Sequence, residues 1–311
     1  MLSAREVESF IEDGYVAVPG AVPADVVRAC REMICSGLAR HGVTEDPGTW
    51  TEPVVRIACP EGGPFAEAGT RPALWEAFDQ LIGAGRWWRR PGVGGTIPVR
   101  FPSLADPGDA GWHIDGSFSV GDDYWVNVRS RERGLLVLFL LTDVSERDAP
   151  TELKVGSHLD VPGLLEPFGD EGTSFGPATS RCPRSTFERQ SAFATGEAGD
   201  VFICHPFLVH RATWPHTGTT PRAIAQPGIA IHEPFRLEEG NPYPVERAIL
   251  NGLGRRGIGV VTDEGESPQT RSPSSMTNAP RRSLVTAPPD MPRTLLRGPT
   301  RSPRTDVRNR F

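Results

Sequence analysis

The 311-residue chain has no long apolar segment, few cysteines and almost no lysine. No run approaches the roughly 18 apolar residues of a membrane span, and the first residues lack the apolar stretch of a signal peptide. The five cysteines are scattered and odd in number, which favours reduced thiols over a disulfide framework. Lys154 is the only lysine, and the net charge of −6 shows no excess of positive charge of the kind that nucleic-acid binding needs. We expect a cytoplasmic protein that binds neither membrane nor nucleic acid.

The last segment, 255–311, is short of the residues that build a core. It holds eleven arginines, eight prolines and five acidic residues, and Phe311 is its only aromatic residue. This composition cannot bury enough apolar surface to offset the entropy of ordering. We expect a disordered Arg/Pro-rich tail after one domain at 1–254. A basic arm for an anionic partner and a reading-frame artefact are alternative interpretations of the tail.

Predicted helices come mostly first in the chain, and predicted strands follow. Apolar spacing and capping residues predict helices at 3–12, 23–38, 73–82 and 244–254. Residues 42–70 are rich in glycine, proline and charge, which favours a long loop. Apolar runs predict strands at 15–19, 96–101, 125–128, 135–141, 153–155, 201–210 and 222–231. This order predicts a mainly β protein with flanking α-helices, folded as a barrel or jelly roll.

Two features indicate which residues are buried. The run 135–141 is apolar on both faces, which is typical of a central, covered strand. Cys30 and Cys35 lie in a predicted helix and Cys204 in a predicted strand. We expect all three to be core thiols.

The chemistry-bearing stretch is Gly111-Trp112-His113-Ile114-Asp115-Gly116. In an extended segment, residues two apart point to the same face, so the imidazole of His113 and the carboxylate of Asp115 can converge. One histidine and one carboxylate are two thirds of a 2-His-1-carboxylate site, which leaves three positions open on a non-haem Fe(II). A lone His-x-Asp is common by chance, so the motif needs a second histidine.

That histidine and a suitable cation follow downstream. His210 ends the apolar run 201–210, which Pro206 interrupts by a bulge or a split. A polar loop comes next, and Arg222 opens the following strand. If the two strands form a hairpin, Arg222 lies beside His210 and can hold a carboxylate through two parallel hydrogen bonds.

Together these pieces resemble the phytanoyl-CoA dioxygenase family of Fe(II)- and 2-oxoglutarate-dependent oxygenases. Further matching pieces are Phe10-Ile11-Glu12-Asp13-Gly14-Tyr15-Val16 and the strand with its Gly-Ser-His turn at 151–158. The resemblance extends over about residues 5 to 254.

The resemblance implies a double-stranded β-helix, a jelly roll of the cupin type. It implies that His113, Asp115 and His210 bind Fe(II) and that Arg222 binds the distal carboxylate of 2-oxoglutarate. The chain would then use O2, with ascorbate as a further reductant, to oxidise a C–H bond of a small metabolite, releasing succinate and CO2. The carboxylate of Asp115 favours hydroxylation or another oxidation over halogenation, because related halogenases need a small residue there.

One segment departs from the family pattern. Many members have proline where Val155 stands and Asn-Gly before it, whereas this chain has Ala149-Pro150-Thr151. Thr151 is the candidate for a polar contact with the co-substrate from this segment.

The other polar and aromatic candidates have plain structural alternatives. We expect His158 and His205 to be structural or core residues, and His41, His216 and His232 to lie in loops or at strand edges. Four residues near the motif line either the substrate pocket or the core: Trp112, Phe118, Trp125 and Asn127. Arg129 and Arg131 either receive an anionic substrate or are solvated.

Two other classes of function stay open on the sequence. One is a non-oxygenase metal enzyme of the cupin type, which uses a similar barrel and ligand set. The other is a non-catalytic binding protein that retains the fold. Substrate identity and oligomeric state are not determined by the residues.

Overall fold

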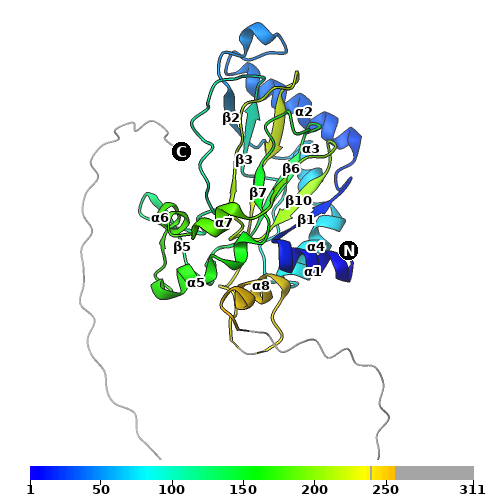
Figure 1. The fold of residues 1–311 in the computed structure, drawn as a ribbon. Helices are drawn as coiled ribbons and strands as arrows, with labels where there is room; N and C mark the ends of the chain where they lie inside the picture. The colour runs from blue at the N-terminus through cyan, green and yellow to red at the C-terminus, as the bar shows by residue number, and fades with distance from the viewer. Residues whose placement is uncertain (239, 256–311) are drawn as a thin grey trace, which may run out of the picture. The chain divides into compact units, whose positions relative to one another are not determined.

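The computed structural model describes residues 1–238 and 240–255. The predicted tail therefore lies, from residue 256 on, outside the described residues. Within the described part, a seven-stranded antiparallel sheet and two three-stranded sheets are flanked by helices (Figure 1). The predicted combination of a mainly β architecture with flanking helices is confirmed.

The seven-stranded sheet has β6 near its centre. Its strands lie in the order β1 (Tyr15–Val18), β10 (Val201–Cys204), β6 (Arg133–Leu140), β12 (Arg222–Ala225), β3 (Thr96–Arg100) and β2 (Val54–Ala58), and β13 (Gly228–Ala230) also pairs with β6. Every pair is antiparallel. The prediction of a central strand at 135–141 is confirmed.

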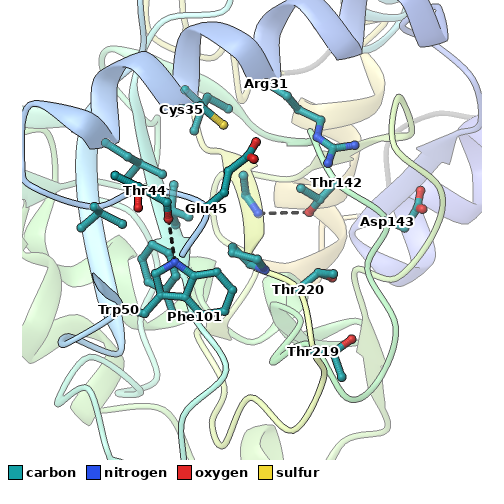
Figure 2. A pocket seen from close by; sticks show the side chains of 16 residues that line it. Arg31, Cys35, Thr44, Glu45, Trp50, Phe101, Thr142, Asp143, Thr219 and Thr220 are labelled. Carbon is teal, nitrogen blue, oxygen red and sulfur yellow. Dashed lines mark hydrogen bonds between the residues drawn. The ribbon is translucent and has the colours of Figure 1, made fainter. Parts of the chain in front are cut away.

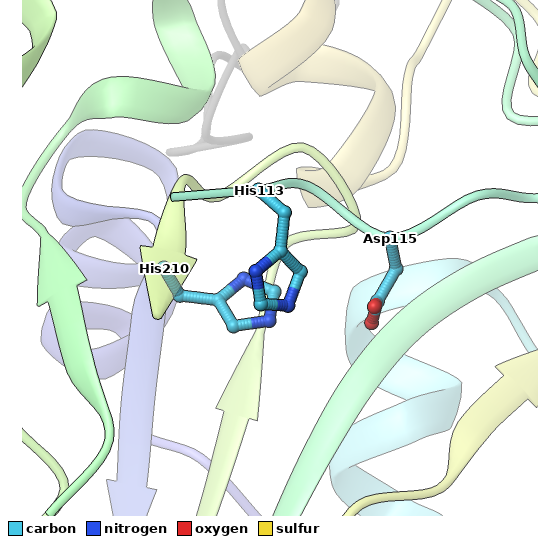
Figure 3. A group of neighbouring side chains, drawn as sticks. All are labelled: His113, Asp115 and His210. Carbon is cyan, nitrogen blue, oxygen red and sulfur yellow. The ribbon is translucent and has the colours of Figure 1, made fainter. Parts of the chain in front are cut away.

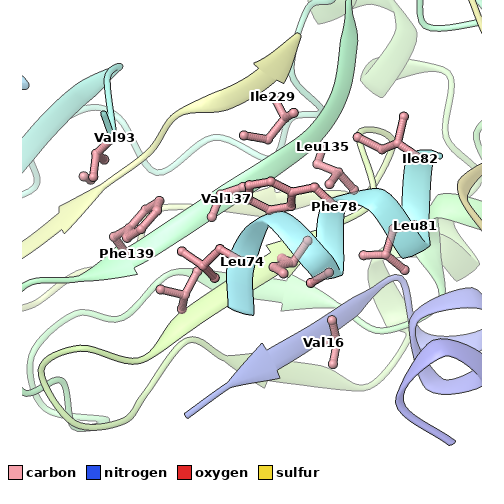
Figure 4. Close-up of a cluster of buried hydrophobic side chains, with 14 of the residues drawn as sticks. Val16, Leu74, Phe78, Leu81, Ile82, Val93, Leu135, Val137, Phe139 and Ile229 are labelled. Carbon is pink, nitrogen blue, oxygen red and sulfur yellow. The ribbon is translucent and has the colours of Figure 1, made fainter. Parts of the chain in front are cut away.

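Strand β6 is apolar throughout because both of its faces are covered. Leu135, Val137 and Phe139 belong to the larger core cluster, which includes residues of α4 (Pro72–Ile82), as Figure 4 shows. Leu136 and Leu138 alternate with them and belong to a second cluster, which faces the interior between the sheets. At about 25 cal/mol per Å² of buried apolar area, such two-sided burial makes this strand a main source of stability.

Two smaller sheets complete the architecture. One has the order β11 (His210–Arg211), β7 (Glu152–Lys154), β9 (Ser191–Phe193), and the other has the order β4 (Phe118–Val120), β5 (Asp123–Val126), β8 (Thr173–Ser174). The predicted strand at 201–210 is split by the turn that contains Pro206, because proline cannot donate to a ladder.

The predicted helices begin and end close to their predicted bounds, and the structure adds α-helices that were not predicted. Helix α1 (Ala4–Asp13) starts at a capping box of Ser3 and Glu6, and α2 (Ala24–Ala39) buries the apolar face that its spacing predicts. The remaining α-helices are α3 (Gly63–Gly69), α5 (Pro162–Leu165), α6 (Phe175–Ser180), α7 (Arg184–Glu188) and α8 (Pro244–Gly252). Short 3₁₀ helices lie at Pro47–Thr49, Ser157–Leu159 and Glu166–Phe168.

Two sequence expectations are wrong. Residues 42–70 do not form one long loop, because β2 pairs with β3 and α3 follows it. Cys35 is exposed on α2, whereas Cys30 and Cys204 are buried as expected. Over the two described ranges, no helix has the length and apolar composition needed to cross a membrane.

Candidate metal centre

His113 and His210 are joined by a pair of backbone hydrogen bonds. The amide of His113 donates to the carbonyl of His210 at 3.0 Å, and the reverse bond is 2.9 Å. This isolated antiparallel bridge brings the two imidazole rings to a centroid distance of 4.3 Å (Figure 3). Asp115 lies two residues further along the extended segment, and one potential ligand atom from each of the three side chains lies within 4.8 Å of the others.

Both histidine rings are oriented by the chain's own carbonyls. Nδ1 of His113 lies 2.9 Å from the carbonyl of Gly111, and Nδ1 of His210 lies 2.9 Å from the carbonyl of Leu208. A carbonyl can only accept, so in each ring Nδ1 carries the proton and donates. The lone pair of Nε2 therefore remains free in each neutral ring, which is the form that binds a metal.

The electrostatics keep His210 and Asp115 in their metal-binding protonation states. Burial, assisted by His113, lowers the pKa of His210 to about 4. Burial acts to raise the pKa of Asp115, but Arg133 and the two histidines together lower it below its ordinary value. Near neutral pH, His210 is therefore neutral and Asp115 is ionised. Protons then compete little with a metal at these two positions.

Asp115 has a fixed cationic neighbour. Nη1 of Arg133, on β6, donates to Oδ2 of Asp115 at 2.8 Å. A hydrogen-bonded ligating carboxylate is held in orientation and keeps one oxygen available. No sequence motif links Arg133 to Asp115, because 18 residues separate the two positions.

The three side chains line a pocket of about 240 Å³, which we call the metal pocket after this candidate ligand set. Four arginines line it too, namely Arg56, Arg100, Arg133 and Arg222. The lining also contains Asp109 and the predicted Thr151. An interior with more guanidinium groups than carboxylates suits an anionic ligand beside the metal centre.

Arg222 is a buried cation with a free donor. Its side chain is 1 % exposed, and it donates to the carbonyls of Asp148 at 3.4 Å and Ala149 at 2.7 Å. Nη1 has no hydrogen-bond partner among the described residues, and no carboxylate there pairs with the guanidinium. Burial, with repulsion from Arg100, lowers the pKa of Arg222 to about 9. Burying an unpaired charge is costly, so the site is arranged for an anion from outside.

Thr151 supplies a second free donor. It is 1 % exposed, and its hydroxyl oxygen has no partner within the part of the chain that the structure describes. Buried hydroxyls are almost always hydrogen-bonded in native proteins. Arg222 and Thr151 thus place two unsatisfied buried polar groups in the same pocket as the three candidate ligands, where a polar ligand could satisfy them.

The predicted hairpin between His210 and Arg222 is wrong. Strand β11 pairs with β7, whereas β12 pairs with β3 and β6, so the two residues belong to different sheets. The connecting loop crosses from one sheet to the other, and His216 within it bridges to Ser103. Both side chains nevertheless line the same pocket, because the sheets face one another across it.

Most of the remaining histidines are structural. His158 is fully buried and its Nε2 lies 3.0 Å from the carbonyl of Ile11, while buried His205 lies 3.2 Å from the carbonyl of Val245. Their predicted structural roles are confirmed. His216 is buried at 4 % exposure within its loop, and His41 and His232 are exposed.

The aromatic residues around the motif do not line the metal pocket. Trp112 lies under the Arg211 guanidinium at 4.3 Å from its ring centroid, and Asn127 donates to the carbonyl of Asp170. Phe118 lines a neighbouring pocket instead. Arg129 is engaged by Glu238 at 2.7 Å.

A larger pocket of about 410 Å³ lies on the other side of the sheet (Figure 2). Val99 and Ala223 line it, and their chain neighbours Arg100 and Arg222 line the metal pocket. Successive residues of a strand point to opposite faces, so β3 and β12 separate the two pockets. The lining described for this pocket holds none of the three candidate ligands.

The fold is similar to those of solved enzymes. SnoK, a non-haem α-ketoglutarate-dependent carbocyclase from nogalamycin biosynthesis, matches with a TM-score of 0.51 and 19% identity over 74% of this chain and 84% of its own. The epimerase SnoN, in complex with Fe³⁺, α-ketoglutarate and nogalamycin RO, matches with a TM-score of 0.49 and 18% identity over 73% of this chain and 82% of its own. HygX from Streptomyces hygroscopicus, with nickel, 2-oxoglutarate and hygromycin B bound, matches with a TM-score of 0.48 and 16% identity over 76% and 90%.

No protein-family model and no curated protein matches the sequence. The likeness to SnoK shows a shared fold. What this chain binds has to be argued from its own site.

Proposed function

We propose that the chain is a non-haem Fe(II)- and 2-oxoglutarate-dependent oxygenase of the phytanoyl-CoA dioxygenase type, built on a double-stranded β-helix within residues 1–254. His113, Asp115 and His210 hold the iron, and Arg222 with Thr151 holds the co-substrate. The observation that carries the proposal is the pairing of this ligand triad with a buried arginine that lacks a carboxylate partner in the described chain. The fold shared with the α-ketoglutarate-dependent SnoK supports it.

The residues fit both groups. Two histidines whose Nδ1 atoms face backbone carbonyls, and one ionised carboxylate, form the facial ligand set typical of non-haem iron. Arg222 Nη1 and Thr151 Oγ1 are unsatisfied donors, and a carboxylate is the acceptor that satisfies a guanidinium best. 2-Oxoglutarate has a metal-chelating end and a distal carboxylate, so it matches the three candidate ligands and Arg222, which line the same pocket.

When bound, iron, 2-oxoglutarate and O2 supply the oxidising power, with release of succinate and CO2. Ascorbate serves as a further reductant. The protein's own part is placement. Backbone carbonyls orient the two histidine rings, Arg133 orients Asp115, and Arg222 positions the distal carboxylate of the co-substrate. Buried walls such as Leu136 limit the access of water. We propose hydroxylation of a C–H bond in a small metabolite as the outcome.

The two alternative classes of function explain less of the pocket. A cupin-type metal enzyme that uses no acidic co-substrate has no need of a buried, unpaired Arg222. A binding protein that retains the fold has no need for both histidines to present free Nε2 atoms beside an ionised carboxylate. The oxygenase accounts for all five residues together.

The test is co-substrate turnover. Purified protein reconstituted with Fe(II) is incubated with 2-oxoglutarate, O2 and a panel of small metabolites, and succinate is measured. The proposal predicts succinate formation that at least one metabolite stimulates and that His210→Ala abolishes. Absence of succinate in the wild-type protein, with or without metabolites, contradicts it.

A further inference from the structure

A third pocket begins one residue beyond Asp115. It has a volume of about 190 Å³ and includes Gly116, Ser117, Tyr124 and strand β13 in its lining. Arg133 lines both this pocket and the metal pocket, so the two adjoin at the guanidinium that holds Asp115. We call it the Arg90 pocket, after the other arginine in its lining.

Arg90 is a cation without an anion. It lies between α4 and β3, is only partly exposed, and forms no ion pair and no side-chain hydrogen bond with any residue in the described ranges. Burial, together with the like charge of Arg133, lowers the pKa of Arg90. Two guanidinium groups that face one pocket repel each other unless an anion lies between them.

Two glycines leave room for the guanidinium groups of Arg90 and Arg133. A Cβ at Gly94 would lie 2.9 Å from Nη1 of Arg90, and a Cβ at Gly228 would lie 2.9 Å from the Arg133 guanidinium. Contacts this short do not occur for real side chains, so the two arginines use space that only glycine leaves open.

Ser117 adds an unused donor. It is 7 % exposed, its amide donates to the carbonyl of Trp125 at 2.7 Å, and its buried hydroxyl has no partner within residues 1–238 and 240–255. The acid in the lining, Glu132, is exposed and pairs with neither arginine within ion-pair distance. Arg131 is not in the described lining, but its guanidinium lies over the ring of the lining residue Phe118, at 5.0 Å from the ring centroid.

We propose that the Arg90 pocket binds an oxyanion of the organic substrate, a carboxylate or a phosphate, and so positions a neighbouring C–H bond of that substrate at the metal centre. The proposal rests on the proposed function, because it gives the substrate class for the same active site. Arg90 and Arg133 supply charge-assisted donors, and the Ser117 hydroxyl supplies a neutral one. The Arg222 end of the other pocket stays reserved for the co-substrate.

The experiment uses protein loaded anaerobically with Fe(II) and saturating 2-oxoglutarate, so that the Arg222 end is filled. Sodium acetate and methyl phosphate are titrated at constant ionic strength, and the broadening of each probe's methyl proton signal by the nearby iron reports binding. Acetate tests for a carboxylate and methyl phosphate for a phosphate. Variants are Arg90→Gln, Ser117→Ala and, as a matched control, Arg89→Gln. Arg89 is exposed, lies over Trp75 and is outside the pocket lining.

We expect one of the probes to bind wild type and Arg89→Gln equally. Arg90→Gln should bind it about tenfold more weakly, as expected for the loss of one charge-assisted contact. Ser117→Ala should bind it about threefold more weakly, with no loss of thermal stability, because its hydroxyl satisfies nothing in the protein. A purely structural Ser117 would leave probe binding unchanged.

Two failures are distinguishable. If the absorption band of bound 2-oxoglutarate does not form in the wild-type protein, the proposed function fails and this inference with it. Suppose instead that the band shows equal affinity for 2-oxoglutarate in wild type and Arg90→Gln. If neither probe then binds, or if each probe binds the two proteins equally, only the Arg90 pocket is refuted. Probe broadening that survives in Arg90→Gln would then arise from iron alone.

Discussion

Arg100 and Arg222 are direct cross-strand partners on β3 and β12, both at 3 % exposure or less, and they differ in their counter-ions. Nη2 of Arg100 donates to both carboxylate oxygens of Asp109 at 2.7 Å, whereas no carboxylate of the described chain pairs with Arg222. The fold thus compensates one buried charge internally and leaves its neighbour for a ligand. We propose that this asymmetry marks a co-substrate site and not an ordinary ion-pair network.

Removing the Asp109 carboxylate should destabilise the protein. Asp109→Asn leaves buried Arg100 without its anion, and breaking one side of a buried pair costs about 3 kcal/mol. We expect the free energy of unfolding in urea to fall by that amount in the ligand-free protein. Asp106→Asn, in the same loop, is the control, because the structure shows its side chain accepting only a local bond from Gly108. Equal stability of the two variants would contradict the assigned pairing.

Thr151→Val should separate affinity from stability. Valine keeps the shape of threonine but removes the unpartnered hydroxyl, so the thermal midpoint should stay the same or rise. Affinity for 2-oxoglutarate should fall about fivefold, which is equivalent to about 1 kcal/mol for one hydrogen bond. Calorimetry under anaerobic conditions measures both quantities. A loss of stability without a loss of affinity would show that the hydroxyl has a structural role.

Iron content should depend on His210 itself and not on the total number of histidines in the chain. His210→Ala removes one of three ligands, so iron bound after anaerobic reconstitution should fall from about one equivalent to a small fraction. His232→Ala is the matched control, because His232 is exposed and its ring centroid lies 4.1 Å from that of Trp88, far from the candidate ligands in the chain. Equal iron in wild type and His210→Ala would refute the ligand set.

Acid sensitivity should arise partly from His158. Burial lowers the folded-state pKa of His158 to about 4, below the value of 6.5 that is ordinary for histidine. The unfolded chain therefore binds more protons between these values, and the free energy of unfolding falls as the pH drops from about 6.5 towards 4. For this group the loss is up to about 3 kcal/mol.

The variant His158→Gln isolates this contribution. Its amide can still donate to the carbonyl of Ile11 but does not titrate. Metal-free His158→Gln should lose less stability between pH 7 and pH 5 than the wild type in urea unfolding, whereas His41→Gln, at an exposed position, should match the wild type. Parallel pH profiles for all three proteins would exclude His158 as a source of the acid sensitivity.

Local sequence signals predicted the parts of the site that are local in the chain. The extended His-x-Asp segment places two candidate ligands on one face, and an apolar run with both faces covered forms β6. The capping box at Ser3 fixed the start of α1. Each of these follows from side-chain periodicity or from a contact within a few residues.

The pairing of strands far apart in the chain could not be predicted from the sequence. Val54–Ala58 is a strand only because β3 offers it an edge, and the glycine- and proline-rich flanks concealed it. Spacing suggested a hairpin for His210 and Arg222, but spacing cannot show which sheet a strand joins. Arg90, Arg100 and Arg133 carried no motif, because their roles arise from partners far away in the chain.

The central claim is that Arg222 receives the distal carboxylate of 2-oxoglutarate beside an iron held by His113, Asp115 and His210. The most direct test is an anaerobic titration of the Fe(II) protein with 2-oxoglutarate, following the metal-to-ligand charge-transfer band. The wild type should develop the band at saturation. Arg222→Ala should bind iron normally but 2-oxoglutarate more weakly, on the order of thirtyfold or more, because one partner of a buried charged contact is lost. Arg222→Lys should recover part of the affinity, since an ammonium keeps the charge but not the planar fork. Absence of the band in the wild type, or equal affinity in Arg222→Ala, would contradict the account.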